Sequence, residues 1–193
     1  MKRVLNVGGN SKKIGLPGVF DGWDHVLLDI DPGGQPDVVC DARELTTLPA
    51  ASYDAVYCSH NLEHYHRHEV PRVLAGFRHV IKPDGFVLIR VPNMQEVLQI
   101  AVERELDIED VLYTSTAGPI TVHDVIYGFG AEIERSGNDF FAHKTGFTPN
   151  TLVRYLNRAG FAHVYLGEAG LDLSAFGLMQ EPDEATRAQL SLG

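Results

Sequence analysis

The 193-residue sequence has no long hydrophobic run and few cysteines. A membrane-spanning helix needs about 18 or more consecutive apolar residues, and no stretch approaches that length. The only cysteines, Cys40 and Cys58, each follow an apolar, strand-like stretch, and the N-terminus carries no secretory leader pattern. We therefore interpret both as reduced, free thiols in a cytoplasmic protein, and neither as a catalytic nucleophile.

Basic residues are also scarce, because 16 lysines and arginines stand against 26 acidic residues, for a net charge of −10. The basic residues form no run longer than two. A protein that binds nucleic acid needs a basic surface to neutralise phosphates. The composition therefore favours a small-molecule partner, without nucleic acid or membrane. It leaves the oligomeric state open, a homodimer included.

The first half of the chain alternates apolar runs with turn residues. Runs rich in valine, isoleucine and leucine predict strands at residues 4–7, 25–30, 37–40, 53–58 and 86–91. Their apolar residues are continuous, which is typical of parallel strands buried on both faces. Helical spacing predicts one helix over residues 70–81 and another over 94–106. Only 16 residues separate the first two strands, so we expect a single turn or an irregular loop where a crossover helix is usual.

The last third predicts one more helix and a hairpin. Thr148-Pro149 and Gly160 are typical start and stop signals of a helix. Strands are expected at residues 161–166 and 171–179, followed by a short helix from Glu181. Together the elements predict a single α/β domain over residues 1–193. Its Rossmann-like sheet should have about seven strands, mostly parallel, with a late antiparallel strand.

Residues 94–147 interrupt the strand and helix pattern. Their later part, residues 107–147, is rich in glycine, threonine, histidine and aromatic residues. We predict that residues 94–147 form an insertion or lid segment within the domain. Loop-borne His123, Tyr127 and His143 are candidate substrate-binding residues for a polar acceptor, with helix capping and packing as the alternative.

Glycines and acids stand where the first three predicted strands end. Gly8-Gly9 follows the first strand, Asp29 lies 21 residues after Gly8, and Asp41 follows the third strand. The carboxyl ends of parallel strands share one edge of the sheet, where nucleotides bind. The dinucleotide fingerprint G-x-G-x-x-G is absent, which argues against NAD and FAD. Asp29 suits ribose hydroxyls, while Asp41 and the backbone of Ala42 suit adenine.

Four histidines and Glu63 lie within the nine residues from His60 to His68. His60 and His64 fall near the end of the fourth strand, where a neutral imidazole can act as a general base. We assign both as candidate catalytic residues. Surface histidines around a helix start are one alternative, and a metal site made by pairs four residues apart is another; our assignment includes no metal.

Several stretches in this order carry a family resemblance: VLNVGG, LLDIDP, DVVCDARELTTLP, SYDAVYCSHNLEHY and VLAGFRHVIKPDGFVLIRVPN. They resemble the class I S-adenosylmethionine-dependent methyltransferases, nearest the bacterial group related to the quinone-biosynthesis methyltransferases. The likeness covers residues 3–93, and residues 143–161 resemble the group's last helix and strand. The first motif is degenerate, because Asn6 stands where the family has an acid, and Asn10 and Lys12 where it has glycine.

The resemblance implies S-adenosyl-L-methionine as the cofactor and a transferase that methylates a small polar acceptor, with oxygen as the expected site. It implies cofactor-binding roles for Asn6, Gly8, Gly9, Asp29, Ile30, Asp41, Ala42, Ser59 and Asn61. Because the first motif is degenerate, the alternative is a catalytically inactive methyltransferase-like module that serves in binding or interaction.

Overall fold

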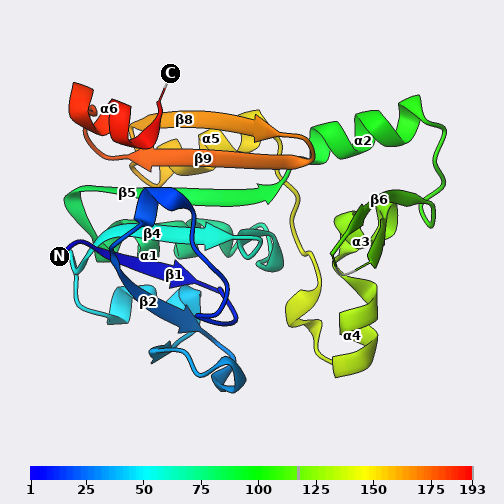
Figure 1. Cartoon of the computed structure of the whole chain (residues 1–193), viewed down its shortest axis with the longest axis horizontal. Coiled ribbons are helices and arrows are strands. Elements are labelled where there is room, and N and C mark those ends of the chain that lie inside the picture. The colour runs from blue at the N-terminus through cyan, green and yellow to red at the C-terminus, as the bar shows by residue number, and fades with distance from the viewer. Residues whose placement is uncertain (117, 193) are drawn as a thin grey trace.

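The computed structural model describes residues 1–116 and 118–192. Its main sheet has seven strands in the order β3-β2-β1-β4-β5-β9-β8 (Figure 1). The parallel strands are β1 (Arg3–Val7), β2 (Asp24–Asp29), β3 (Val38–Val39), β4 (Tyr53–Ser59) and β5 (Ile81–Pro92). Strand β9 (Asp172–Leu178) runs antiparallel to both β5 and β8 (His163–Ala169). The predicted Rossmann-like fold is therefore confirmed, with its late antiparallel strand.

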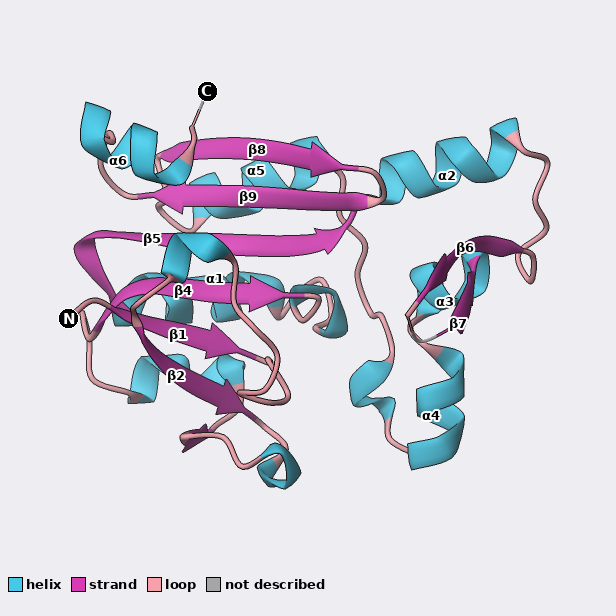
Figure 2. Ribbon diagram, viewed as in Figure 1, coloured by secondary structure: helices cyan, strands magenta, loops and turns pink. Residues whose placement is uncertain are grey.

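Helical elements cover both faces of the sheet (Figure 2). Helices α1 (Val70–Val80) and α5 (Pro149–Arg158) enclose the larger core, which includes Phe77, Phe147 and Phe161. Helix α6 (Glu184–Leu190) and the 3-10 turn η1 (Gly18–Phe20) enclose a smaller core on the other face. Turn η1 stands in the short connection between β1 and β2, in agreement with the sequence. None of the helices in the described ranges has the length and hydrophobicity to cross a bilayer.

Segment 94–147 lies beyond the carboxyl ends of the parallel strands (Figure 1). It contains α2 (Met94–Glu103), the hairpin of β6 (Val111–Ser115) and β7 (Gly118–Thr121), α3 (Val122–Tyr127), α4 (Gly130–Ser136) and the 3-10 turn η5 (Asp139–Phe141). A third small core, which includes Val97, Leu112 and Ile120, forms within it. Leu98 and Val102, expected to be buried on the apolar stripe of α2, are 53% and 78% exposed because α2 projects away from the sheet.

Segment 94–147 begins and ends at one place beside β5. Asn93 and Phe147 form an isolated parallel bridge, and the backbone nitrogen of Met94 donates to the carbonyl oxygen of Phe147 at 2.9 Å. The backbone nitrogen of Asn93 also donates to the carbonyl oxygen of Leu171, just before β9, at 2.8 Å. The segment is thereby fixed to the edge of the sheet at which the parallel strands end.

Candidate functional site

The turn after β1 is packed too tightly to accept side chains. Gly8 has φ +71°, and a Cβ placed on it would lie 2.1 Å from Nδ2 of Asn61. A Cβ on Gly9 would lie 2.1 Å from Nδ2 of Asn6. Asn10 adopts φ +58°, a left-handed conformation that asparagine tolerates better than most residues. The turn therefore bends at a position where the resembled family has glycine.

Asn6 and Lys12, the other departures from the family pattern, have partners within the protein. Asn6 is 3% exposed, and its Nδ2 lies 3.2 Å from Nε2 of His25. The Asn6 side chain therefore packs against Gly9 inside the protein and does not point to the edge of the sheet where the parallel strands end. Lys12 forms an ion pair with Asp37, with Nζ 2.6 Å from Oδ2. Both residues stabilise the neighbourhood of the turn, Asn6 by its contact with His25 and Lys12 by an ion pair that glycine could not form.

Asp29, at the end of β2, lies directly beside this turn. Its Oδ2 accepts a hydrogen bond from the backbone nitrogen of Asn10 at 3.0 Å, and its Oδ1 accepts one from Asp31 at 3.0 Å. Each carboxylate oxygen has two lone pairs, so both oxygens keep one for a ligand. This arrangement fits the two hydroxyls of a ribose. Ile30 is 41% exposed at the same edge, while Asp31 turns away to cap the next turn by accepting from Gly33.

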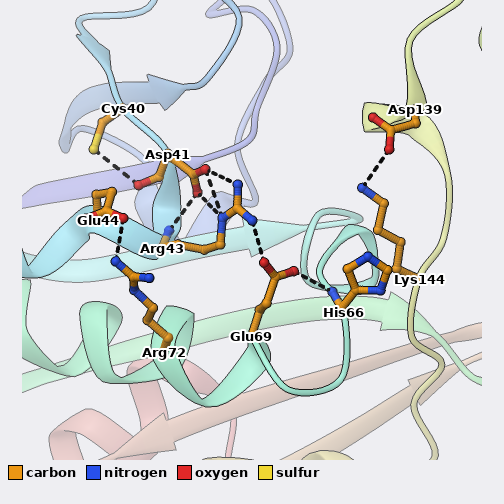
Figure 3. Close-up of polar contacts among 9 residues, drawn as sticks. All are labelled: Cys40, Asp41, Arg43, Glu44, His66, Glu69, Arg72, Asp139 and Lys144. Atoms are coloured by element: carbon orange, nitrogen blue, oxygen red, sulfur yellow. Dashed lines mark hydrogen bonds and ion pairs between the residues drawn. The ribbon is translucent and has the colours of Figure 1, made fainter.

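Asp41, expected to face adenine, is held by Arg43 (Figure 3). Its Oδ2 lies 2.6 Å from Nη2 of Arg43, and the same guanidinium binds Glu69 just before α1. Burial alone would raise the pKa of Asp41, but the hydrogen bonds from Arg43 outweigh it and lower that pKa. An adenine amino group would therefore share this carboxylate with Arg43. The neighbouring Ala42 is buried, as expected of a residue that presents only its backbone to a ligand.

Replacing Arg43 with alanine is expected to lower the free energy of unfolding by about 1–2 kcal/mol at pH 7. Arg43 lowers the pKa of Glu69, and it lowers the pKa of Asp41 against the effect of burial. Their stabilising contribution is therefore complete above the unfolded-state pKa values of about 4 and is lost as the pH falls through the lower folded-state values. Urea unfolding at pH 7 and pH 3 measures this.

The matched control is Arg72→Ala, which breaks an ion pair with Glu44 whose two side chains are 59% and 50% exposed. Exposed pairs contribute little, so this variant should cost under about 0.5 kcal/mol. The loss of unfolding free energy caused by Arg43→Ala should be smaller at pH 3 than at pH 7. A deficit of equal size at both pH values would contradict the ion-pair explanation.

Tyr65 belongs to this edge, although sequence reasoning assigned it no role. Burial raises the pKa of its hydroxyl, and the nearby Cys58, Asp41 and Asp29 raise it further. Its ring packs against the larger core. Tyr65 is therefore close enough to Asp29 and Asp41 for their charges to affect its hydroxyl. Its only sequence signal was its place in the histidine-rich stretch after β4. Asn61, from the same connection, lies half-buried beside Gly8, and Ser59 is the half-buried last residue of β4.

A cavity of about 150 Å³ lies between the sheet edge and segment 94–147. His60 and Asp172 line it from the ends of β4 and β9, and Tyr113, Asp124 and His143 line it from the segment. The polar groups thus come from five separate stretches of chain. Tyr113 and Asp172 were not predicted, because strand register alone brings them here. Strand β9 pairs Asp172 with Pro92, the last residue of β5.

The ring of His60 lies between two carboxylates at this cavity. Its Nδ1 is 3.5 Å from Oε1 of Glu63, and its Nε2 is 3.5 Å from Oδ1 of Asp172. Asp172 and Glu63 raise the pKa of His60 to about 9, against the effect of burial. The two carboxylates therefore favour the protonated imidazole, whereas the sequence suggested a neutral base. Arg90 completes the cluster, with Nη2 2.5 Å from Oδ2 of Asp172.

His64 and His143 lie side by side, with ring centres 5.0 Å apart. The ring nitrogens of His64 are each 3.1 Å from a carbonyl oxygen, one of His60 and one of Ala142. His64 thus bridges the end of β4 to segment 94–147 and is not part of the cavity wall. His143 does line the cavity. Burial lowers its pKa, and its Nδ1 lies 2.8 Å from the carbonyl oxygen of Val125.

His123 and Tyr127 lie next to each other but outside the cavity. Their rings are 5.0 Å apart on an exposed side of α3, and Tyr127 is 52% exposed. Neither side chain is part of the cavity wall. Of the three substrate-binding residues expected from the sequence, only His143 reaches it. The thiol of Cys58 is fully buried, and burial raises its pKa, which suits the expected inert thiol.

Comparison with known proteins agrees with this architecture. A family model described as a methyltransferase domain matches residues 25–89, from β2 into β5. No curated protein matches the sequence. A crystal structure of a SAM-dependent methyltransferase from Archaeoglobus fulgidus is similar, with a TM-score of 0.56 and 16% identity over 91% of this chain and 85% of that one.

Two further solved structures have the same fold. A SAM-dependent methyltransferase from Methanosarcina mazei has a TM-score of 0.55 and 16% identity over 92% of this chain and 93% of that one. The 1,6-didemethyltoxoflavin-N1-methyltransferase of Burkholderia thailandensis, solved with its substrate and S-adenosylhomocysteine, has a TM-score of 0.52 and 19% identity over 91% and 71%. The chain therefore has the α/β Rossmann-like methyltransferase fold, and fold and family model together support a class I methyltransferase.

Proposed function

We propose that this protein transfers a methyl group from S-adenosyl-L-methionine to the hydroxyl of a small polar acceptor. The observation that carries the proposal is the 150 Å³ cavity at the carboxyl edge of the sheet, with polar groups on both walls. Sites for drug-sized ligands are about 300 Å³ or larger, so this volume favours a small acceptor. The family model and the methyltransferase neighbours support the cofactor.

The glycine turn and Asp29 would hold the cofactor. Gly8 and Gly9 let the backbone approach it closely, and Asp29 keeps one lone pair on each oxygen for the ribose. Ile30 and Ala42 would flank the adenosine. Asp41 would bind it while keeping its ion pair with Arg43. Ser59 and Asn61 would line the side where the methyl group lies. Asn6 would act indirectly, because its buried side chain packs against Gly9. When bound, the cofactor supplies a methyl group already activated by its sulfonium charge.

The chain's own contribution is to orient the acceptor and to accept its proton. Asp172 lines the cavity, and its carboxylate would accept a hydrogen bond from a hydroxyl, whereas the Asp124 carboxylate already accepts from Thr121 and Gly130. As the new oxygen–carbon bond forms, the hydroxyl proton would pass to the Asp172 carboxylate that accepts its hydrogen bond, and from there to water. His60 contacts the acceptor from the end of β4. His64 is a positioning residue, because it binds the carbonyl oxygen of His60. Segment 94–147 serves as the lid that completes the cavity.

Transfer of isotope-labelled methyl groups to panels of small alcohols, sugars, hydroxy acids and amines tests the proposal. We expect label on hydroxyl acceptors, and Asp172→Asn should lower kcat/KM about 100-fold, because it removes a charged hydrogen-bond acceptor from the wall. Asp84→Asn, on an exposed turn at the start of β5, is the matched control and should leave kcat/KM unchanged. Label found only on amines would contradict O-methylation.

A binding module without catalysis is the second candidate. The observation that favours it is the turn after β1, where Asn10 and Lys12 stand in place of the glycines of the resembled family and Lys12 is paired with Asp37. Such a module would bind S-adenosylhomocysteine tightly and transfer no label to any acceptor in the panel. Calorimetry with S-adenosylhomocysteine, together with the labelling experiment above, therefore separates the two candidates.

A further inference from the structure

We propose that Glu63, His64 and His143 bind one divalent transition-metal ion, with Zn²⁺ as the best-suited metal. One ligand atom from each side chain lies within 4.8 Å of the other two. Glu63 and His64 belong to the 3-10 turn η4 (Leu62–His64) after β4, and His143 comes from the end of segment 94–147. The sequence had suggested histidine pairs four residues apart, but η4 ends at His64 and the third ligand comes from much later in the chain.

The Glu63 carboxylate is the strongest sign of a missing ligand. Glu63 is 1% exposed, and among the described residues neither of its carboxylate oxygens has a hydrogen-bond partner. Its one ionic neighbour, His60, lies 3.5 Å away, too far for a good hydrogen bond. An ionised carboxylate is costly to bury without a hydrogen-bonded partner or a metal ion. His60 offsets part of this cost by its charge but makes no hydrogen bond, and a metal ion bound directly to Glu63 would remove the rest.

Space for an ion lies next to this carboxylate. A small void of about 10 Å³ is lined by Glu63, His143 and Thr145, among others, while His64 lies beside it and is not part of its lining. The hydroxyl oxygen of Thr145 is also buried without a hydrogen-bond partner in the described part of the chain. A void of this size is comparable to a single water or ion. Unpartnered oxygens on two residues thus face a space that is too small for an organic ligand.

One of the two histidines, His143, is arranged as metal ligands usually are. Nδ1 of His143 donates its proton to the carbonyl oxygen of Val125 at 2.8 Å, which leaves Nε2 as a free acceptor. Metal-binding histidines typically donate the other ring N–H to such a group. His64 has a carbonyl oxygen 3.1 Å from each ring nitrogen, but a neutral imidazole has only one N–H. To bind an ion, His64 would therefore give up one of these two contacts and keep the other.

The donor set selects the class of metal. Two imidazoles and one carboxylate suit Zn²⁺ and its first-row neighbours, whereas Mg²⁺ and Ca²⁺ prefer oxygen ligands alone. Zinc bonds of about 2.0–2.1 Å place ligand atoms about 3.4 Å apart. The three side chains therefore draw together on binding. Three protein ligands leave a fourth position open, and His143 also borders the acceptor cavity.

The ion would fasten segment 94–147 to the end of β4. The backbone already joins them here, because the nitrogens of Lys144 and Thr145 donate to the carbonyl oxygen of Glu63 at 2.8 and 3.1 Å. Metal binding adds a bond between side chains across the same junction. This inference does not depend on the proposed methyl transfer, because the ion can be measured without any turnover.

Calorimetric titration of the untagged, chelator-treated protein with ZnCl₂ tests the inference. We expect one equivalent of Zn²⁺ per chain, a higher melting temperature with Zn²⁺, and no comparable response to MgCl₂. Glu63→Gln, which keeps the shape of the side chain, and His143→Ala should each weaken Zn²⁺ binding at least tenfold. The melting temperature of each variant without metal reports whether it still folds.

The matched control is the double variant His66→Ala/His68→Ala. These two histidines are exposed, and their rings stack on each other with centres 5.6 Å apart. The control should bind Zn²⁺ as the wild type does. The inference is overturned if the wild type takes up no Zn²⁺, if Glu63→Gln binds it unchanged, or if the surface pair is the one whose loss removes it.

Discussion

Replacing Asp29 with alanine should weaken binding of S-adenosylhomocysteine by at least about 100-fold. Each hydrogen bond from a ribose hydroxyl to a carboxylate contributes about 1.5–3 kcal/mol, and two such bonds would be lost. The variant also removes the acceptor for the backbone nitrogens of Asn10 and Asp31, which shape the turn over the ligand. Isothermal titration calorimetry measures the affinity, and thermal unfolding checks that the variant remains folded.

Asp31→Ala is the control for this effect, because Asp31 has the same charge two residues away but is exposed and caps a separate turn. Its affinity should stay within about twofold of wild type. Asp29→Asn keeps one acceptor oxygen, so its affinity for S-adenosylhomocysteine should fall by an intermediate factor, about tenfold. Equal affinity in Asp29→Ala and wild type would exclude Asp29 from the cofactor site.

Replacing Phe147 with alanine should lower the free energy of unfolding by about 3–5 kcal/mol. Phe147 is fully buried in the larger core, and its ring lies 6.0 Å from that of Tyr155. The large loss follows because removal of the ring leaves a cavity that rigid neighbouring strands cannot fill. Urea unfolding measures it.

Phe140→Ala is the matched comparison, because that ring lies in segment 94–147 and is 45% exposed. It should cost under about 0.5 kcal/mol. If the two variants lost similar stability, the assignment of Phe147 to the main core would be wrong.

The sequence was a good guide to the sheet because buried parallel strands need continuous apolar residues. Helix α1 began and ended within one residue of its prediction, since Pro71 and Pro83 mark its two ends. The η1 turn also followed from the short, glycine-rich connection. These features depend on local chemistry, which a single sequence displays directly.

The partners of the site residues could not be predicted in the same way. Arg43 lies two residues from Asp41, and its long side chain reaches both that acid and Glu69 only after α1 has packed. His60 finds Asp172 because β9 inserts beside β5 in one register. These pairings depend on tertiary packing between distant segments, so the spacing of residues in the sequence does not predict them.

The adjacency of Asn93 and Phe147 has a consequence for evolution. A segment whose two ends already touch can be lengthened, shortened or exchanged at little cost in chain entropy, because the sheet holds the ends together whatever lies between them. Segment 94–147 also contains a small core of its own. Relatives could therefore acquire new acceptors by replacing this one stretch, while the strands that carry Gly8, Asp29 and Asp41 stay unchanged.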